Sequence, residues 1–194
     1  MSAIFLWWIG MGATPDRTLE DVRAHVQRVY GLPAVLWPGV ERPNDTFDPR
    51  RGQHASGRVL EWLLRHRPAG AVRTLGLTDV DLFIPVLTFV YGEAQLNGPV
   101  AVISTARLGG MPGAAGTRLL GARLAKEAVH ELGHTFGLLH CDAPRCAMKR
   151  SVNVAAIDVK ATTLCGDCRT LLLEHALEQE NDHEQGPHAD LDRR

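Results

Sequence analysis

The feature that most constrains this 194-residue chain is a pair of histidines inside a strongly helical stretch, residues 117–139. In the run His130-Glu131-Leu132-Gly133-His134 the two histidines stand four residues apart. Residues at this spacing lie on the same face of an α-helix, one turn apart, so both imidazoles can reach one zinc ion with bonds of about 2.0–2.1 Å. A histidine pair of this kind also occurs on ordinary helix surfaces, so a third ligand is needed to support a metal site.

The third ligand is predicted beyond the end of the helix. His140 follows His134 by six residues, which is about 9 Å along an uninterrupted helix and too far to share the metal. Gly137 resolves this, because glycine adopts the left-handed conformation that ends many helices and lets the chain turn back. Three histidines with an open fourth position are typical of a catalytic zinc, and Glu131 is placed to take a proton from a water molecule there.

All four cysteines of the chain follow closely behind the third histidine. Four residues separate Cys141 from Cys146, and two separate Cys165 from Cys168, a spacing typical of a tetrahedral four-cysteine zinc site. Such a site is closed and therefore structural, and it would tie the loop that carries His140 to the last helix. Two disulfides are the alternative in a secreted protein, and an iron–sulfur cluster is the alternative among metal sites. The sequence thus predicts two zinc ions, one catalytic and one structural.

Apolar runs and amphipathic helical patterns alternate along the chain. Strands are predicted at residues 4–9, 34–37, 72–77, 86–91 and 100–104. This alternation predicts an α/β (α+β) fold with a mixed, mostly parallel twisted sheet and covering helices. We expect an N-terminal subdomain at 1–137 with the sheet and the active-site helix, and a small zinc-stabilised C-terminal subdomain at 138–180. Residues 181–194 are charged and nearly free of apolar residues, which predicts a disordered tail.

Composition narrows the classes of partner. The net charge is −1 and the pI about 6.7, so no basic field favours nucleic acid or an anionic membrane. No apolar stretch approaches the roughly 20 residues that span a bilayer. The apolar run at 3–9 lacks the charged residues that begin a signal peptide and is better explained as a buried strand. We therefore expect a cytoplasmic protein, a monomer that binds neither nucleic acid nor membrane.

Taken together, these motifs resemble those of the archaemetzincins, a branch of the metzincin zinc peptidases. The resemblance extends upstream to the stretches 75–83 and 89–96. It rests on His130, Glu131, His134, Gly137, His140, Cys141, Cys146, Met148, Cys165 and Cys168.

The resemblance implies a metzincin-like fold with a cleft between a larger N-terminal and a smaller C-terminal part. Met148 would pack beneath the zinc-binding histidines, and a peptide substrate would pair with an edge strand at about 89–92. Some other metzincins carry a tyrosine shortly after this methionine, but Lys149 and Arg150 stand here. That departure argues against a mechanism in which such a tyrosine stabilises an oxyanion.

The resulting hypothesis is a zinc metallopeptidase that cleaves peptides or proteins with Glu131 as general base. The main alternative is a zinc-binding module of the same fold that recognises peptides with little or no catalysis, since metal sites survive loss of activity. A hydrolase acting on another amide would use the same residues.

Overall fold

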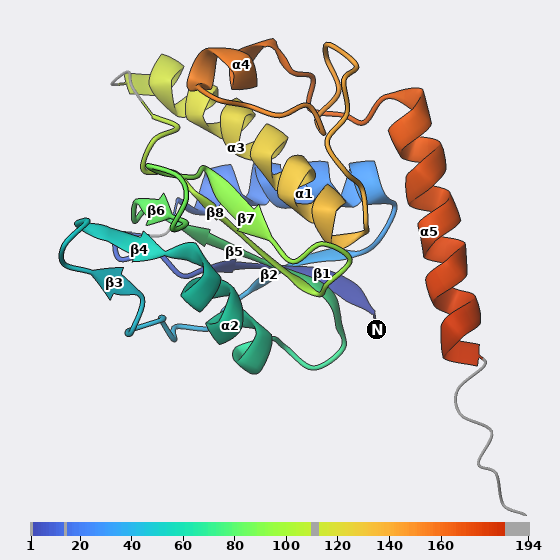
Figure 1. Cartoon of the computed structure of the whole chain (residues 1–194), viewed down its shortest axis with the longest axis horizontal. Coiled ribbons are helices and arrows are strands. Elements are labelled where there is room, and N and C mark those ends of the chain that lie inside the picture. Colours follow the sequence, from blue (N-terminus) through green and yellow to red (C-terminus); the bar gives the residue numbers. More distant parts are fainter. Residues whose placement is uncertain (1, 14, 110–112, 185–194) are drawn as a thin grey trace, which may run out of the picture.

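The computed structural model describes residues 2–13, 15–109 and 113–184. Its main body is a five-stranded sheet with the strand order β2-β1-β5-β8-β7 (Figure 1). All neighbouring strands are parallel except β7, which pairs antiparallel with β8 at one edge. The strands are β1 (Ala3–Trp8), β2 (Ala34–Trp37), β5 (Ala71–Thr78), β7 (Gly92–Ala94) and β8 (Val100–Ser104). The predicted α/β fold with a mixed, mostly parallel sheet is confirmed.

Helices cover both faces of this sheet. Helices α1 (Asp16–Tyr30) and α3 (Gly113–Thr135) lie on one face, and α2 (Ser56–His66) lies on the other (Figure 1). Successive side chains of β1 point to opposite faces, so Leu6 joins the core under α1 and α3 whereas Trp7 joins the core under α2. The sheet is therefore buried on both sides, which explains the nearly continuous apolar runs of its central strands.

A second, smaller sheet has the order β3-β4-β6. It consists of β3 (Phe47–Asp48), β4 (Gln53–Ala55) and β6 (Leu82–Phe83). Two of these strands have only two residues each, too short for a periodic pattern in the sequence to indicate them.

The prediction of a strand at 86–91 is wrong: within that range only Val90 makes an isolated bridge, antiparallel to Leu82. Residues 84–87 form a turn in which the amide of Leu87 donates to the carbonyl of Ile84 at 3.1 Å, and Pro85 stands at a position that favours such turns. Val86 is 84% exposed, so this apolar run does not enter the core. The edge strand β7 begins only at Gly92, the residue at which the sequence pattern predicted that the strand would end.

The C-terminal part contains α4 (Val154–Val159), which lies over α3, and α5 (Gly166–Glu184), which stands at the side of the molecule (Figure 1). Polar contacts fix it to α3: the guanidinium of Arg123 pairs with Asp158 at 2.7 Å, and Lys126 Nζ donates to the carbonyl of Ile157 at 3.0 Å. Helix α5 continues to Glu184, four residues beyond the boundary predicted at 180, because the charged sequence there still permits helix. Residues 185–194 of the predicted tail lie outside the described residues.

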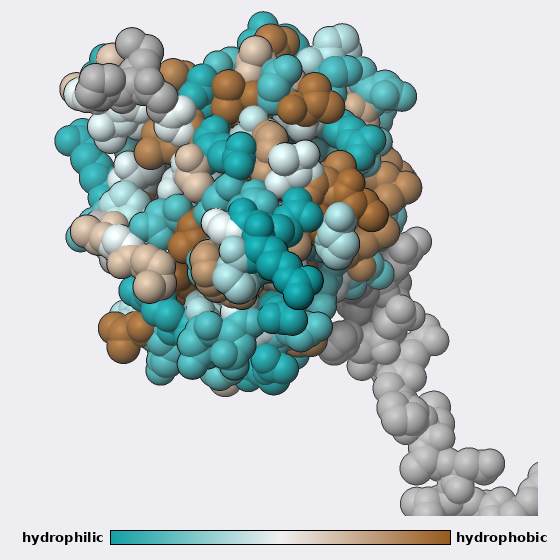
Figure 2. All heavy atoms as spheres, turned by 60° about the vertical axis from the view of Figure 1, so that its left-hand side comes forward, coloured by the Kyte–Doolittle hydropathy of each residue, from teal (hydrophilic) through white to brown (hydrophobic). Residues whose placement is uncertain are grey.

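The surface carries apolar residues in patches among hydrophilic ones on the face shown in Figure 2. Several large apolar side chains are exposed, including Leu96, Leu139 and Val152, at 57%, 67% and 75%. Within the described part of the chain, no helix has both the length and the hydrophobicity that a membrane span requires.

Candidate metal centres and active-site cleft

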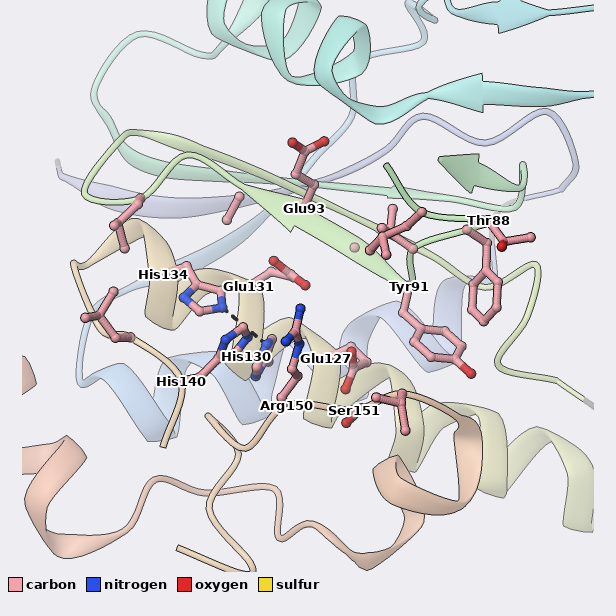
Figure 3. A pocket seen from close by; sticks show the side chains of 18 residues that line it. Thr88, Tyr91, Glu93, Glu127, His130, Glu131, His134, His140, Arg150 and Ser151 are labelled. Carbon is pink, nitrogen blue, oxygen red and sulfur yellow. Dashed lines mark hydrogen bonds between the residues drawn. The ribbon is translucent and has the colours of Figure 1, made fainter. Parts of the chain in front are cut away.

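The end of helix α3 brings the three predicted histidines together. The helix stops at Thr135, and Gly137 has a φ of +89°, the left-handed conformation that the sequence pattern required. The amide of Gly137 donates to the carbonyl of His134 at 3.0 Å, so the chain reverses within one turn. Ring nitrogens of His130, His134 and His140 consequently lie within 4.8 Å of one another, and Figure 3 shows the three rings clustered in the cleft.

The ring orientations in this cluster fit a metal ion. His130 Nδ1 donates to the carbonyl of Ala147 at 2.8 Å, and His134 Nδ1 donates to the carbonyl of Leu138 at 2.7 Å. With their protons engaged there, both Nε2 atoms carry free lone pairs, yet they lie only 3.2 Å apart. Two nitrogens bound tetrahedrally to one zinc at about 2.0–2.1 Å would be about 3.3–3.4 Å apart. The pair therefore has the separation expected of two ligands.

Electrostatics also favours neutral imidazoles in this cluster. Burial lowers the pKa of His130 well below its usual range, and the nearby charge of Lys160 lowers it further. Burial lowers the pKa values of His134 and His140 too. Neutral imidazole is the form that binds a metal, so these side chains are ready to act as ligands near neutral pH.

Glu131 is buried beside the histidines and faces the edge strand. It is 6% exposed, and burial raises the pKa of its carboxyl well above the usual range, helped by the negative charges of Glu127 and Glu93. A side chain at Gly92 would place its Cβ only 2.8 Å from Glu131 Oε1, so the carboxylate lies directly against β7. Glu131 and all three histidines border one cleft of about 580 Å³.

The loop that carries Met148 forms the base of the site. Met148 is fully buried against Gly133, in the middle of the histidine motif, as the family resemblance implies. Beneath the loop, Lys160 Nζ lies 3.0 Å from Glu127 Oε1, and both side chains are at most 4% exposed. Lys160 Nζ also donates to the carbonyl of Ala147 at 3.2 Å, the same carbonyl that orients His130.

The four cysteines form a second cluster. Cys141 Sγ lies 3.8 Å from Cys165 Sγ, and Cys146 Sγ lies 3.7 Å from Cys168 Sγ. A disulfide would need about 2.05 Å, so these are free thiols. All four sulfurs lie within 4.8 Å of one another, and a tetrahedral site with bonds near 2.3 Å places sulfurs about 3.8 Å apart. The geometry fits a four-cysteine metal site, whereas the alternative of two disulfides is not present.

The cleft also contains residues that the motifs did not indicate: Tyr91, Glu127, Arg150 and Ser151 (Figure 3). Glu93 lines it too, as the family's placement of the edge strand implies. One signal was available for Glu127, because it stands four residues before Glu131 and so shares its helix face. Nothing in the sequence places the loop residues Arg150 and Ser151, since their position depends on how the C-terminal part folds over α3.

The fold and this cleft together indicate the class of enzyme to which the chain belongs. A helix that presents two histidines and a glutamate at the edge of a mixed sheet, completed by a histidine after a glycine turn, is the arrangement of a zinc metallopeptidase. The pattern of peptidase family M54 matches residues 15–174. The chain is therefore a member of peptidase family M54, the archaemetzincins, and a zinc-dependent hydrolase of peptide or protein substrates.

Individual relatives agree with this assignment. The archaemetzincin of Haloquadratum walsbyi is 35% identical over 169 residues, which cover 84% of this chain and 96% of that protein. The crystal structure of the archaemetzincin of Methanopyrus kandleri superimposes with a TM-score of 0.81 at 32% identity and covers 91% of this chain and 96% of its own. That of Archaeoglobus fulgidus, complexed with malonate, has a TM-score of 0.73 at 29% identity, with coverages of 87% and 99%.

Proposed function

We propose that this chain hydrolyses peptide bonds with a zinc held by His130, His134 and His140, and with Glu131 as general base. The observation that carries the proposal is the 3.2 Å separation of two Nε2 atoms whose ring protons are both engaged elsewhere. Without a shared cation, two facing lone pairs at this distance would repel each other.

In the proposed hydrolysis, the bound zinc and Glu131 would have different roles. When bound, zinc supplies a Lewis acid that polarises a carbonyl and lowers the pKa of a bound water to about 7. A carboxylate oxygen of Glu131 takes the proton of the attacking water and then delivers it to the leaving nitrogen of the peptide. Burial keeps Glu131 away from bulk water, so that the proton stays within the cleft between the two steps.

The cleft is suited to an extended peptide. Strand β7 forms the outer edge of the sheet and lines the cleft, so its backbone can pair with a substrate strand by β-augmentation. Exposed apolar residues border the cleft on both sides: Leu87, Leu96, Leu139 and Val152. Main-chain pairing would supply affinity, and these side chains would contact the side chains of the peptide.

The four cysteines would hold a second, structural zinc. Four thiolates leave no open position for a water or substrate, so this ion would act through the fold alone. It would join the loop after His140 to the start of α5 and thereby fix the third histidine. An iron–sulfur cluster on the same thiolates would colour the purified protein brown.

Cleavage of a peptide library tests this proposal. We expect the zinc-loaded chain to generate new peptide termini, detected by mass spectrometry, and Glu131→Gln to keep its zinc but lose cleavage by about 10²–10⁴-fold. Equal cleavage by Glu131→Gln would remove that residue from the mechanism. No cleavage by the zinc-loaded wild type would instead favour the non-catalytic peptide-binding module.

A further inference from the structure

Arg150 is a cation in the cleft that the proposed mechanism does not use. Its side chain is exposed and lines the cleft on the side formed by the loop after Met148. Among the described residues its guanidinium has no hydrogen-bond or ion-pair partner. Nearby arginines differ in this respect: Arg51 donates to the carbonyl of Leu87 at 2.7 Å, and Arg107 pairs with Asp81 at 2.6 Å.

The position of Arg150 places its charge beside the reaction centre. Figure 3 shows the side chain pointing into the cleft, close to the histidines. Its charge contributes to the low pKa of His140, after burial and the charge of His134. The adjacent Ser151 has a buried hydroxyl that finds no hydrogen-bond partner within the described ranges. A substrate group next to the cleaved bond would therefore meet an unpaired guanidinium.

The charges that line the cleft indicate which kind of substrate group would bind beside Arg150. Three carboxylates line it, but Glu127 is paired with Lys160 at 3.0 Å and Glu131 is the proposed general base. The carboxylate of Glu93, on β7, points away from the histidines (Figure 3). A cationic substrate group would be repelled by Arg150 and by a zinc ion. A carboxylate matches the planar fork of a guanidinium and can accept two parallel hydrogen bonds from it.

We propose that Arg150 forms a subsite for a carboxylate, so that the enzyme prefers peptides with a carboxylate beside the cleaved bond. The inference rests on the proposed function, since it specifies the substrate class of the same cleft. The carboxylate has two sources, the side chain of an acidic residue or the free C-terminus of a short peptide. Arg150 acts here as a binding residue and takes no part in proton transfer.

Two pairs of peptide hydroxamates test the subsite by affinity, independently of turnover. In the first pair the residue next to the hydroxamate is Glu or Gln; in the second pair, built on Ala, the C-terminus is a free acid or an amide. Dissociation constants are measured by calorimetry on the full zinc-loaded chain. We expect the carboxylate member of at least one pair to bind about 10-fold more tightly than its neutral partner, and the responding pair identifies the source.

Variants connect this preference to Arg150. Arg150→Gln should abolish the preference for the carboxylate member. Arg150→Glu should reverse it, so that the neutral member of the responding pair binds more tightly. Lys149→Gln is the matched control, because it removes the same charge from the neighbouring residue, whose Nζ donates to the carbonyl of Asp142 at 3.3 Å and which does not line the cleft. This control should keep the preference, and a rise in salt should weaken it.

The outcomes separate the two proposals. If all hydroxamates bind the wild type equally, or if Arg150→Gln keeps the preference, the carboxylate subsite is refuted while the zinc peptidase site stands. If no hydroxamate binds the zinc-loaded chain, the open catalytic zinc is refuted and the subsite with it.

Discussion

Replacing Lys160 by methionine should destabilise the fold strongly. The change leaves Glu127 without its partner at 3.0 Å, in a site where its side chain is 4% exposed. Removing one member of a buried ion pair typically costs about 3–5 kcal/mol. A second estimate of the loss in stability agrees with this value. In the variant Glu127 can avoid being a buried, unpaired charge by taking up a proton. Protonating a carboxyl of ordinary pKa 4.5 at pH 7 costs about 3.4 kcal/mol, at about 1.36 kcal/mol per pH unit.

Urea unfolding at pH 7 measures this loss, with the free zinc concentration held constant because bound zinc adds to apparent stability. The double variant Glu127→Gln/Lys160→Met removes both charges and should recover about 2 kcal/mol of the loss. Lys149→Met, in the loop before α4 and with a single side-chain contact at 3.3 Å, should stay within about 0.5 kcal/mol of wild type. A loss below about 1 kcal/mol for Lys160→Met, with no recovery in the double variant, would show that Glu127 does not depend on Lys160 for its burial.

Two further predictions follow from the contacts of the cleft and its surroundings. Gly92→Ala would place a Cβ 2.7 Å from both Glu131 Cγ and the carbonyl oxygen of Val102, so Glu131 must move. We expect kcat/KM on the best library peptide to fall about 10²-fold at unchanged zinc content, and wild-type kinetics would contradict the placement of Glu131 against β7. The Arg107 guanidinium holds the pKa of Asp81 below its usual range, so this ion pair stabilises the fold above the unfolded pKa of about 3.9, and the contribution is lost as pH falls through the lowered folded value. Asp81→Asn should therefore cost about 1 kcal/mol in urea unfolding at pH 7 and progressively less as the pH is lowered below about 3.9, whereas a cost that does not fall with pH would exclude the ionised pair as its source.

The two residue clusters, three histidines and four cysteines, could be predicted from the sequence because each depends on local geometry. Helical spacing fixes His130 relative to His134, and a single glycine turn decides where His140 arrives. The short spacings within each cysteine pair likewise bring the two sulfurs close together, with one pair in a loop and the other at the start of a helix. The alternation of apolar runs was enough to predict the mostly parallel sheet, since central strands buried on both faces are apolar throughout.

The rest of the site depends on tertiary contacts that no local pattern encodes. The edge strand lies at Gly92–Ala94 because those residues pair with β8, whereas the apolar run before them begins in a turn and makes only one bridge, from Val90 to Leu82. The pair of Glu127 and Lys160 joins residues far apart in sequence, and helix α4 is a six-residue element in a stretch of turn residues. Arg150 enters the cleft only because the C-terminal part folds back over α3.

The zinc content per folded chain decides whether both metal centres exist, and it is measured by elemental analysis of protein purified without added zinc or chelator. We expect close to two zinc ions for the wild type, about one for His134→Ala and about one for Cys165→Ser, each shown to be folded by circular dichroism. A folded wild type without zinc, or a His134→Ala variant that keeps both ions, would contradict this expectation.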